Sequence, residues 1–234
     1  MDSFWYKLSP AEVSAIFLSI KVALWAVGLS LPPALGLGWL LARKEFLGKG
    51  LLDALLHLPM VMPPVVVGYG LLLLCGNRGP LGPLLQTIGF PLAFHWRGAA
   101  LAAAVVSFPL MINAIRLSIE AIDLELEEAA RSLGAKPWRV YLSITLPLSL
   151  PGILTGGILA FARSLGEFGA TITFVSNIPG ETRTLPLALF NAAQVPGGDA
   201  LALRLAVISI LLSLAALMGA RSLSTRSLAS RRRH

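Results

Sequence analysis

Two charged residues, Arg163 and Glu167, lie four positions apart inside a strongly apolar stretch of the chain. Side chains with this spacing share one face of a helix, so the two can neutralise each other. A charge inside a membrane costs roughly 3 kcal/mol and normally faces a partner or a cavity. The pair is therefore expected either to stabilise the packing of the helix or to belong to a gate or pathway.

Hydroxyl groups accompany this pair along the chain. Ser164, Thr171 and Thr173 offer hydrogen-bond donors, which together with a guanidinium suit an oxyanion. A second apolar stretch is interrupted by Pro63 and Pro64, and broken backbone is tolerated in a membrane where protein or a water-filled cavity satisfies it. These residues are candidates for a translocation pathway, and a kinked packing helix is the alternative for the prolines.

Composition identifies the kind of chain that must position these groups. Of its 234 residues 56% are hydrophobic and only 13% are charged, which excludes an ordinary soluble domain and indicates an integral membrane protein. Residues 76–98 are expected to form an external loop with an interfacial segment, and 176–199 a polar loop. Five stretches are long and apolar enough to span a bilayer: 13–42, 55–75, 99–118, 151–175 and 200–219.

The net charge of +7 is distributed by topology rather than in a nucleic-acid-binding patch. Five spans place the 43–50 loop, the 120–149 loop and the basic tail 220–234 on one side, with eleven Lys and Arg residues. The opposite side holds four Lys and Arg residues. This asymmetry predicts a cytoplasmic C-terminus and an N-terminus outside.

The longest polar interruption of the apolar sequence is residues 128–147. Strong helix formers predict a helix over 120–133, which Gly134 would end in the left-handed conformation. Pro137 suits the first turn of a second short helix, expected over 137–143. Trp138 and Arg139 combine large apolar surface with positive charge, which is typical of a segment that fits a groove on a partner.

This interruption resembles the EAA loop of bacterial ABC importer permeases. Seven positions match at the family's spacing: Glu128, Ala129, Ala130, Gly134, Ile144, Leu146 and Pro147. A second block, ARSLGEFGATITFVSNIPGETRTLPLALF over 162–190, is similar to the molybdate branch, whose nearest relatives carry sulfate. The resemblance implies an all-α, type I ABC importer permease formed by one transmembrane domain over 1–234. It also implies that the following residues contact an ATP-binding subunit: Glu128, Ala129, Ala130, Gly134, Lys136, Trp138 and Arg139.

The resemblance further implies the partners of the chain. These are a second copy, two cytoplasmic ATP-binding subunits that carry ATP and Mg²⁺, a periplasmic or extracellular oxyanion-binding protein, and membrane lipid around the permease. Glu181 and Arg183 lie in the external 176–199 loop and are candidates for contact with the binding protein, although a solvated loop is an equally good interpretation. No cofactor is expected in the chain itself.

Missing motifs limit the function further. The sequence has no G-x-x-x-x-G-K-[ST] phosphate loop, no nucleophile-elbow serine motif and no H-E-x-x-H zinc motif. His57 and His95 stand without a second ligand at metal spacing. We therefore expect a translocation subunit rather than an enzyme, with no metal site.

Three transport functions remain open from the sequence. Import of molybdate or tungstate is favoured, a sulfate or other oxyanion ABC permease is the nearer alternative, and a secondary transporter is the more distant one. Entry of a dianion against about 100 mV costs on the order of 4.6 kcal/mol, so accumulation requires an energy source. Molybdate and tungstate, two tetrahedral dianions of nearly equal size, are not separated by sequence.

Overall fold

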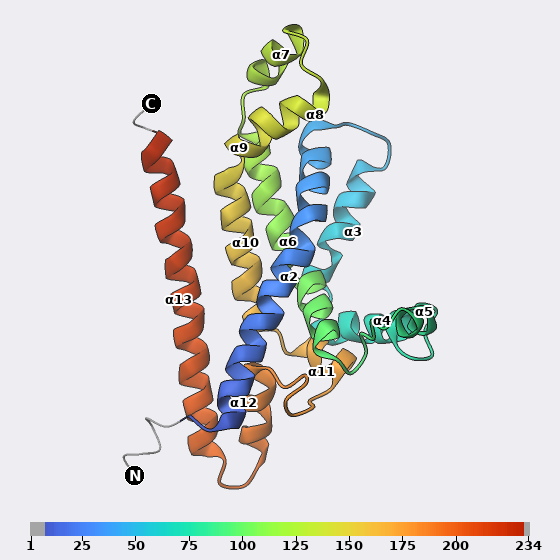
Figure 1. The fold of residues 1–234 in the computed structure, drawn as a ribbon, viewed down its shortest axis with the longest axis vertical. Coiled ribbons are helices and arrows are strands. Elements are labelled where there is room, and N and C mark those ends of the chain that lie inside the picture. Colours follow the sequence, from blue (N-terminus) through green and yellow to red (C-terminus); the bar gives the residue numbers. More distant parts are fainter. Residues whose placement is uncertain (1–7, 232–234) are drawn as a thin grey trace.

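The structure is a computed structural model that describes residues 8–231, with side chains described as far as Gly219. Regular structure in the described residues is entirely helical, which confirms the all-α expectation (Figure 1). The helices in chain order are α2 (Pro10–Arg43), α3 (Lys49–Val61), α4 (Pro64–Cys75), α5 (Gly82–Thr87), α6 (Trp96–Glu120), α7 (Leu124–Ser132), α8 (Pro137–Val140), the π-helix η1 (Tyr141–Thr145), α9 (Leu146–Leu148), α10 (Leu150–Leu165), α11 (Gly169–Val175), α12 (Leu185–Gln194) and α13 (Asp199–Arg231).

Helices α2, α6 and α10 form the centre of the bundle, where each packs on the other two. Small residues allow this close approach: a Cβ added at Gly156 of α10 would lie 2.9 Å from the Met111 carbonyl oxygen of α6. The buried face of α6 is rich in alanine, and its N-terminal half packs against Ala26 of α2 in one apolar cluster. The centre therefore depends on small side chains in close contact.

Three of the five expected spans are continuous helices. They are Pro10–Arg43, Trp96–Glu120 and the described part of α13, Asp199–Gly219, with 34, 25 and 21 residues. Each is long enough to cross a hydrocarbon core of about 30 Å at about 1.5 Å per residue. The prediction of these three spans is confirmed, with ends that differ by a few residues.

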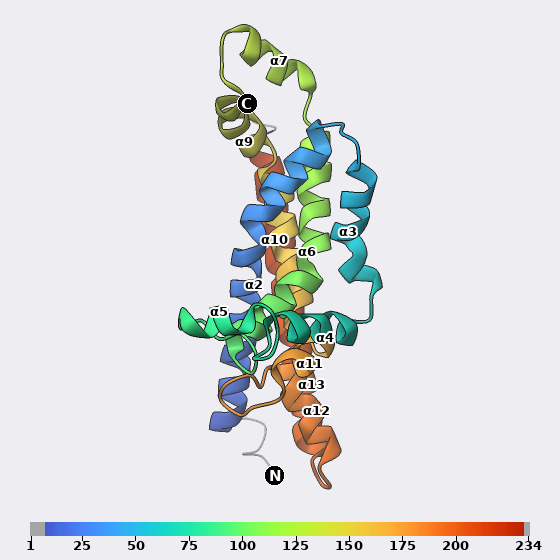
Figure 2. The ribbon, with the colours of Figure 1, turned by 90° about the vertical axis from the view of Figure 1, so that its right-hand side faces the viewer.

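The other two expected spans are interrupted. The irregular backbone expected for the span over 55–75 is confirmed, whereas the expectation of one uninterrupted span over 151–175 is wrong. Helices α3 and α4 meet at 111°, where Pro63 and Pro64 interrupt the backbone hydrogen bonds. Helix α10 ends at Leu165, and α11 begins only at Gly169. Both views show α4 running across the bundle rather than along it, with α5 beyond it (Figures 1 and 2).

The connecting segments also differ from expectation. The single helix predicted over 120–133 is divided, because α6 ends at Glu120 and Asp123 caps α7 by accepting a hydrogen bond from the Glu125 amide at 3.0 Å. The helix predicted over 137–143 continues through η1 and α9 to Leu148. The loop expected over 176–199 contains α12, whose apolar residues pack against α13 and α2.

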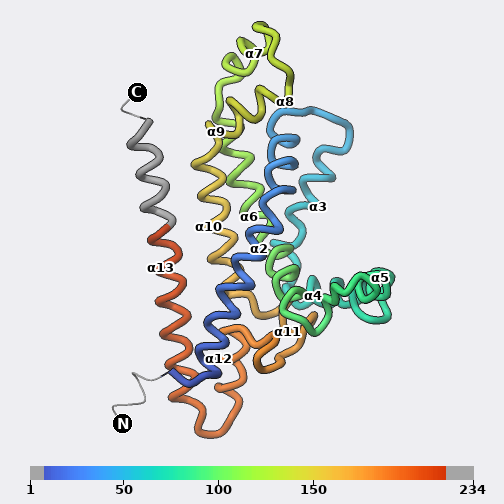
Figure 3. The backbone as a smooth tube through the Cα atoms, in the orientation of Figure 1, coloured from blue at the N-terminus to red at the C-terminus, as the bar shows by residue number. Residues whose placement is uncertain are grey.

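The ends of the bundle agree with the predicted pairing of loops. The α2–α3 connection lies at the same end as α7 and α8, and α12 lies at the opposite end (Figure 3). Helix α13 runs from the α12 end toward the α7 end and continues to Arg231, so part of the predicted basic tail is helical (Figure 1). Its side chains beyond Gly219, and residues 232–234, lie outside the described part.

Candidate functional site

A buried glutamate fixes the loop that contains α7 and α8. The Glu127 side chain is 1% exposed, and its Oε1 lies 3.1 Å from Nε of Arg43, the last residue of α2. Thr145 of η1 donates to the same oxygen at 2.9 Å, and Arg131 Nη2 lies 3.2 Å from Oε2. Arg43 also donates to the Ile122 carbonyl at 2.9 Å. One carboxylate thus joins the end of a span to both halves of the loop.

The loop has a second attachment to α2. The Tyr141 hydroxyl donates to the Leu35 carbonyl at 3.3 Å, and the Tyr141 ring meets Trp39 edge to face, with 5.9 Å between ring centres. Both attachments link the loop to a helix that spans the bundle. A force applied to the loop therefore reaches α2 through the Arg43–Glu127 pair and through these aromatic rings.

The predicted coupling residues lie on the outside of this fixed loop. Leu133 is 90% exposed and Trp138 57% exposed, although both are large and apolar. Gly134 has φ +86°, which confirms the predicted left-handed end of α7. Exposed apolar side chains gathered on a loop are typical of an interaction surface. The predicted set comprises one half-buried residue, Ala130, and six exposed ones: Glu128, Ala129, Gly134, Lys136, Trp138 and Arg139.

The two interrupted spans touch each other close to their breaks. A Cβ added at Gly169, the first residue of α11, would lie 3.0 Å from the Pro64 Cβ at the start of α4. At Gly68 an added Cβ would overlap the carbonyl of Ala170, with the Ala170 Cα at 2.8 Å. Pro63 is exposed and Pro64 half-buried. The structure therefore brings together the proline pair and the 163–173 segment, which sequence analysis proposed separately.

Arg163 and Glu167 form an ion pair at this second break, with Nη1 2.8 Å from Oε2. The expectation that they share one continuous helix is wrong, because α10 ends at Leu165 and Glu167 lies between the two helices. The Glu167 side chain is 2% exposed and that of Arg163 is 34% exposed. Glu167 Oε1 also accepts from the Ala170 amide at 2.8 Å, so the carboxylate faces the N-terminus of α11.

The hydroxyl groups of this region contact the protein itself. Ser164 is buried and donates to Ser107 Oγ of α6 at 3.3 Å, and Thr173 donates to the Gly169 carbonyl at 2.8 Å. Thr171 is buried. Of the predicted pathway residues that are charged or carry a hydroxyl group, Arg163 combines a charge with exposed surface most clearly.

Glu181 and Arg183 both have partners within the chain. Glu181 Oε1 accepts from the Trp96 amide at the start of α6 at 3.3 Å and lies 3.1 Å from His95 Nδ1. Arg183 Nε donates to Asn177 Oδ1 at 2.8 Å. Glu181 is partly exposed, with 38% of its side chain accessible, so contact with a second protein is sterically open.

Sequence reasoning missed several charged contacts between distant segments. Arg116 of α6 lies 3.1 Å from Asp53 of α3 and 2.8 Å from Glu120. Glu12 of α2 and Arg204 of α13 form a buried ion pair across 192 positions. The four-residue spacing of Arg116 and Glu120 was visible in the sequence, whereas the other partners are distant along the chain. The described residues hold no group of three His, Cys, Asp or Glu side chains suited to a metal ion.

Continuous and interrupted apolar helices, with a fixed, partly apolar loop at one end of the bundle, define a multi-pass membrane protein. Comparison with known proteins gives the family. Residues 34–227 match the family described as "Binding-protein-dependent transport system inner membrane component", and the chain belongs to this family.

Relatives support this assignment over almost the whole chain. The chain is 59% identical over 212 residues to "Molybdenum transport system permease protein ModB" of Escherichia coli (strain K12), covering 90% of this chain and 93% of that protein. The protein of the same description from Haemophilus influenzae is 55% identical over 92% of this chain and 94% of its own length. "Probable sulfate transport system permease protein cysT" of Chlorokybus atmophyticus is 35% identical, over 82% of this chain and 67% of that protein.

Solved structures share the fold. A bacterial ABC transporter involved in the import of the acidic polysaccharide alginate matches with a TM-score of 0.73 and 16% identity, over 94% of this chain and 80% of that chain. The MetNI methionine ABC transporter in an inward-facing conformation matches with a TM-score of 0.69 and 13% identity, over 94% and 99%. The chain therefore has the fold of ABC importer permeases, as its sequence predicted.

Proposed function

We propose that this chain is the permease subunit of an ATP-driven importer that carries molybdate or tungstate across the membrane. The observation that carries the proposal is the 59% identity to a molybdenum transport permease over 90% of the chain. Import of an anion against the membrane potential requires energy from a partner. The exposed surface of the α7–α8 loop supports the proposal because such a partner could bind there. ATP hydrolysis would then take place on a separate subunit.

Sulfate import is the second candidate. It is favoured by the 35% identity to a probable sulfate permease over 82% of the chain. Molybdate, tungstate and sulfate are all tetrahedral dianions, so the same types of donor group suit all three. The higher identity to the molybdenum permeases favours molybdate over sulfate.

The proposed assembly contains two copies of this chain, two ATP-binding subunits and a periplasmic binding protein. The family description supports dependence on a binding protein, and the alginate transporter has been solved in complex with a periplasmic protein. The ATP-binding subunits would contact the α7–α8 loop on the cytoplasmic side. This orientation agrees with the excess of basic residues at that end, and it puts the N-terminus outside.

The pathway of this proposal passes the two adjacent helix breaks. Pro63 and Pro64 would form one wall and the segment from Arg163 to Thr173 the other, because Gly169 lies against Pro64. The half-exposed Arg163 would attract the anion, while Glu167 holds its guanidinium in place. Movement of α2 or α10 by the loop would change the distance between the breaks.

Transport into vesicles tests the function. Right-side-out or reconstituted vesicles would hold this chain and its ATP-binding subunit with ATP inside, and would receive the binding protein and labelled molybdate outside, with tungstate or sulfate as competitor. ATP-dependent molybdate uptake that tungstate inhibits and excess sulfate leaves unchanged is the expected result. Inhibition by sulfate would assign the second candidate, and uptake without ATP would contradict an ATP-driven importer.

A charge reversal tests the proposed binding-protein contact. Glu181→Lys would lower uptake at limiting binding-protein concentration, and excess binding protein would restore it if the residue contributes to docking. Unchanged uptake at every binding-protein concentration would contradict the contact. It would leave Glu181 as a residue that stabilises the start of α6.

A further inference from the structure

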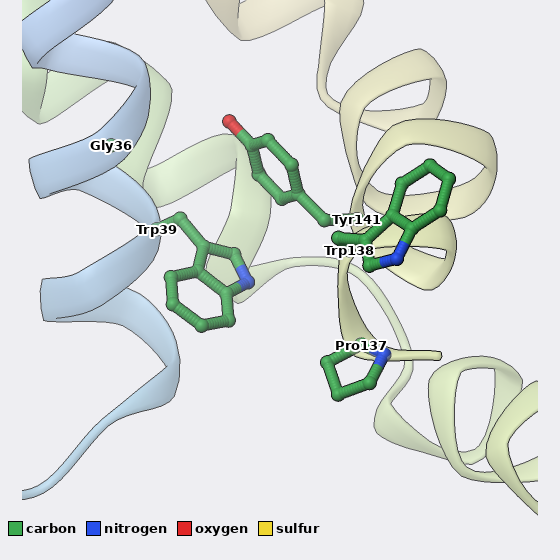
Figure 4. Close-up of a pocket in the computed structure, with 5 residues that line it drawn as sticks. All are labelled: Gly36, Trp39, Pro137, Trp138 and Tyr141. Carbon is green, nitrogen blue, oxygen red and sulfur yellow. The ribbon is translucent and has the colours of Figure 1, made fainter. Parts of the chain in front are cut away.

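An aromatic groove opens between α2 and α8, and it shares Trp138 with the outer face of the loop (Figure 4). It has a volume of about 300 Å³, and its walls are almost entirely apolar. Trp39 and Tyr141 extend toward each other from the two sides (Figure 4). Gly36 lies three residues before Trp39 on the same helix face and leaves that part of the wall without a side chain. The lining residues are Gly36, Trp39, Pro137, Trp138 and Tyr141.

Cations flank this groove on both sides. Lys44 is exposed, and its Nζ lies 5.8 Å from the centre of the Trp39 ring. Across the groove, Arg139 Cζ lies 5.5 Å from the centre of the Trp138 ring, and the exposed Lys136 directly precedes α8. Within the described residues none of these three cations pairs with a carboxylate. Their charges are therefore available to a ligand in the chain without its ATP-binding subunit, since Lys136 and Arg139 also belong to the residues predicted to contact that subunit.

Neighbouring basic residues, unlike these three cations, do pair with carboxylates. Arg43 pairs with the buried Glu127, and Lys49 Nζ lies 2.6 Å from Glu45 Oε1. Glu45, which follows Lys44, pairs with Lys49 instead, so Lys44 at the groove is left without a carboxylate partner while its basic neighbours are paired. An apolar slot bordered by unpaired cations complements a molecule with an apolar body and a negative head.

The position of the groove identifies that molecule. Trp39 lies near the end of the 34-residue span α2, and tryptophan and tyrosine at the ends of spans sit at the level of the lipid head groups. Basic pockets between helices at this depth bind anionic head groups. We propose that the groove binds one anionic phospholipid, with an acyl chain against Trp39 and Tyr141 and its phosphate near Lys44 and Arg139.

This site does not depend on which anion the protein transports. The lipid would lie between α2 and α8, in contact with both the span and the loop that the Arg43–Glu127 pair connects. Its presence would fill space between them and strengthen the second attachment of the loop. Anionic lipid content of the membrane would then affect how firmly the loop is held.

Native mass spectrometry of the purified full-length chain tests the proposal. Phosphatidylglycerol and phosphatidylcholine would be added separately at equal concentrations. The expected result is tighter binding of phosphatidylglycerol, weakened about fivefold by Lys44→Gln with phosphatidylcholine unchanged. Lys49→Gln is the matched control, because it removes the same charge from the same connection without touching the groove, and it should leave both affinities unchanged. Trp39→Ala should weaken both lipids.

Four results would overturn the proposal. They are equal affinity for the two lipids, equal losses for Lys44→Gln and Lys49→Gln, no retained lipid, and loss of the lipid when the ATP-binding subunit is added. The last result would assign the groove to that subunit. Lys44 is exposed, so its substitution keeps the test valid if Trp39→Ala lowers the yield of folded protein.

Discussion

Arg43 and Glu127 pair at 3.1 Å across 84 positions of sequence, with 7% and 1% of their side chains exposed. Arg43 is the last residue of a helix that spans the bundle, and Glu127 lies on the first helix of the loop. A buried carboxylate is stable only when its charge is compensated, here by Arg43, Arg131 and the Thr145 hydroxyl. The loop therefore has a fixed position relative to α2 before any partner binds.

Glu127→Gln is expected to lower the stability of the protein. Loss of one member of a buried ion pair costs about 3–5 kcal/mol, because the other charge remains without its partner. The thermal midpoint of the purified chain should fall clearly. Glu125→Gln, at an exposed position on the same helix, is the control and should leave the midpoint unchanged. Equal midpoints for both variants would show that the buried pair does not hold the loop.

Gly134→Ala is expected to disturb the end of α7. At φ +86° a residue with a Cβ costs about 1–2 kcal/mol more than glycine, although the surrounding space is open. ATP-driven uptake should fall, because the turn sets the angle between α7 and α8. Gly50→Ala on α3 is the control, since it also meets open space but is helical without a positive φ. Uptake that is equal in the two variants would contradict a positional role for Gly134.

The sequence predicts the features of this fold that depend on local composition. The long apolar stretches predicted three spans that are continuous helices in the structure, and Gly134 correctly predicted the left-handed end of α7. Pro63 and Pro64 predicted an irregular second span, but not the 111° angle, which brings α4 against α11. That angle depends on the contact of Gly68 with Ala170, which lie about a hundred positions apart.

Contacts between residues far apart in sequence also limited the prediction of single residues in the candidate site. The EAA motif identified Glu128 as a site residue, and Glu128 is exposed. The adjacent Glu127, which the motif does not include, is buried and forms the ion pair with Arg43. Which of two neighbouring carboxylates faces inward depends on α2, far away in sequence. The spacing of Arg163 and Glu167 did predict their pairing, even though the helix between them ends.

Gly68→Ala is expected to separate α4 from α11. The added methyl would overlap the Ala170 carbonyl, and overpacking of this kind costs about 1–3 kcal/mol. Both the thermal midpoint and uptake should decrease. Gly70→Ala on the same helix meets no atom within 4 Å and should leave both unchanged. If Gly68→Ala behaved like Gly70→Ala, close contact between the two broken spans would not be needed for transport.

Variants of Arg163 and Glu167 distinguish a packing role from a pathway role. Arg163→Gln leaves a carboxylate that is 2% exposed without its cation, so protein level is expected to fall together with uptake. This single variant therefore does not separate the two roles. Arg163→Lys keeps the charge but not the geometry of the guanidinium, and should retain part of the uptake.

The double variant Arg163→Gln with Glu167→Gln makes the distinction. Replacement of both charges removes the unpaired carboxylate, so protein level in the membrane should recover. Uptake per molecule should remain low, because the half-exposed cation that attracts the anion is missing. Immunodetection of the protein and labelled molybdate uptake in the same vesicles measure both quantities. Recovery of uptake in parallel with protein level would show that the pair only stabilises the fold, and it would remove Arg163 from the proposed pathway.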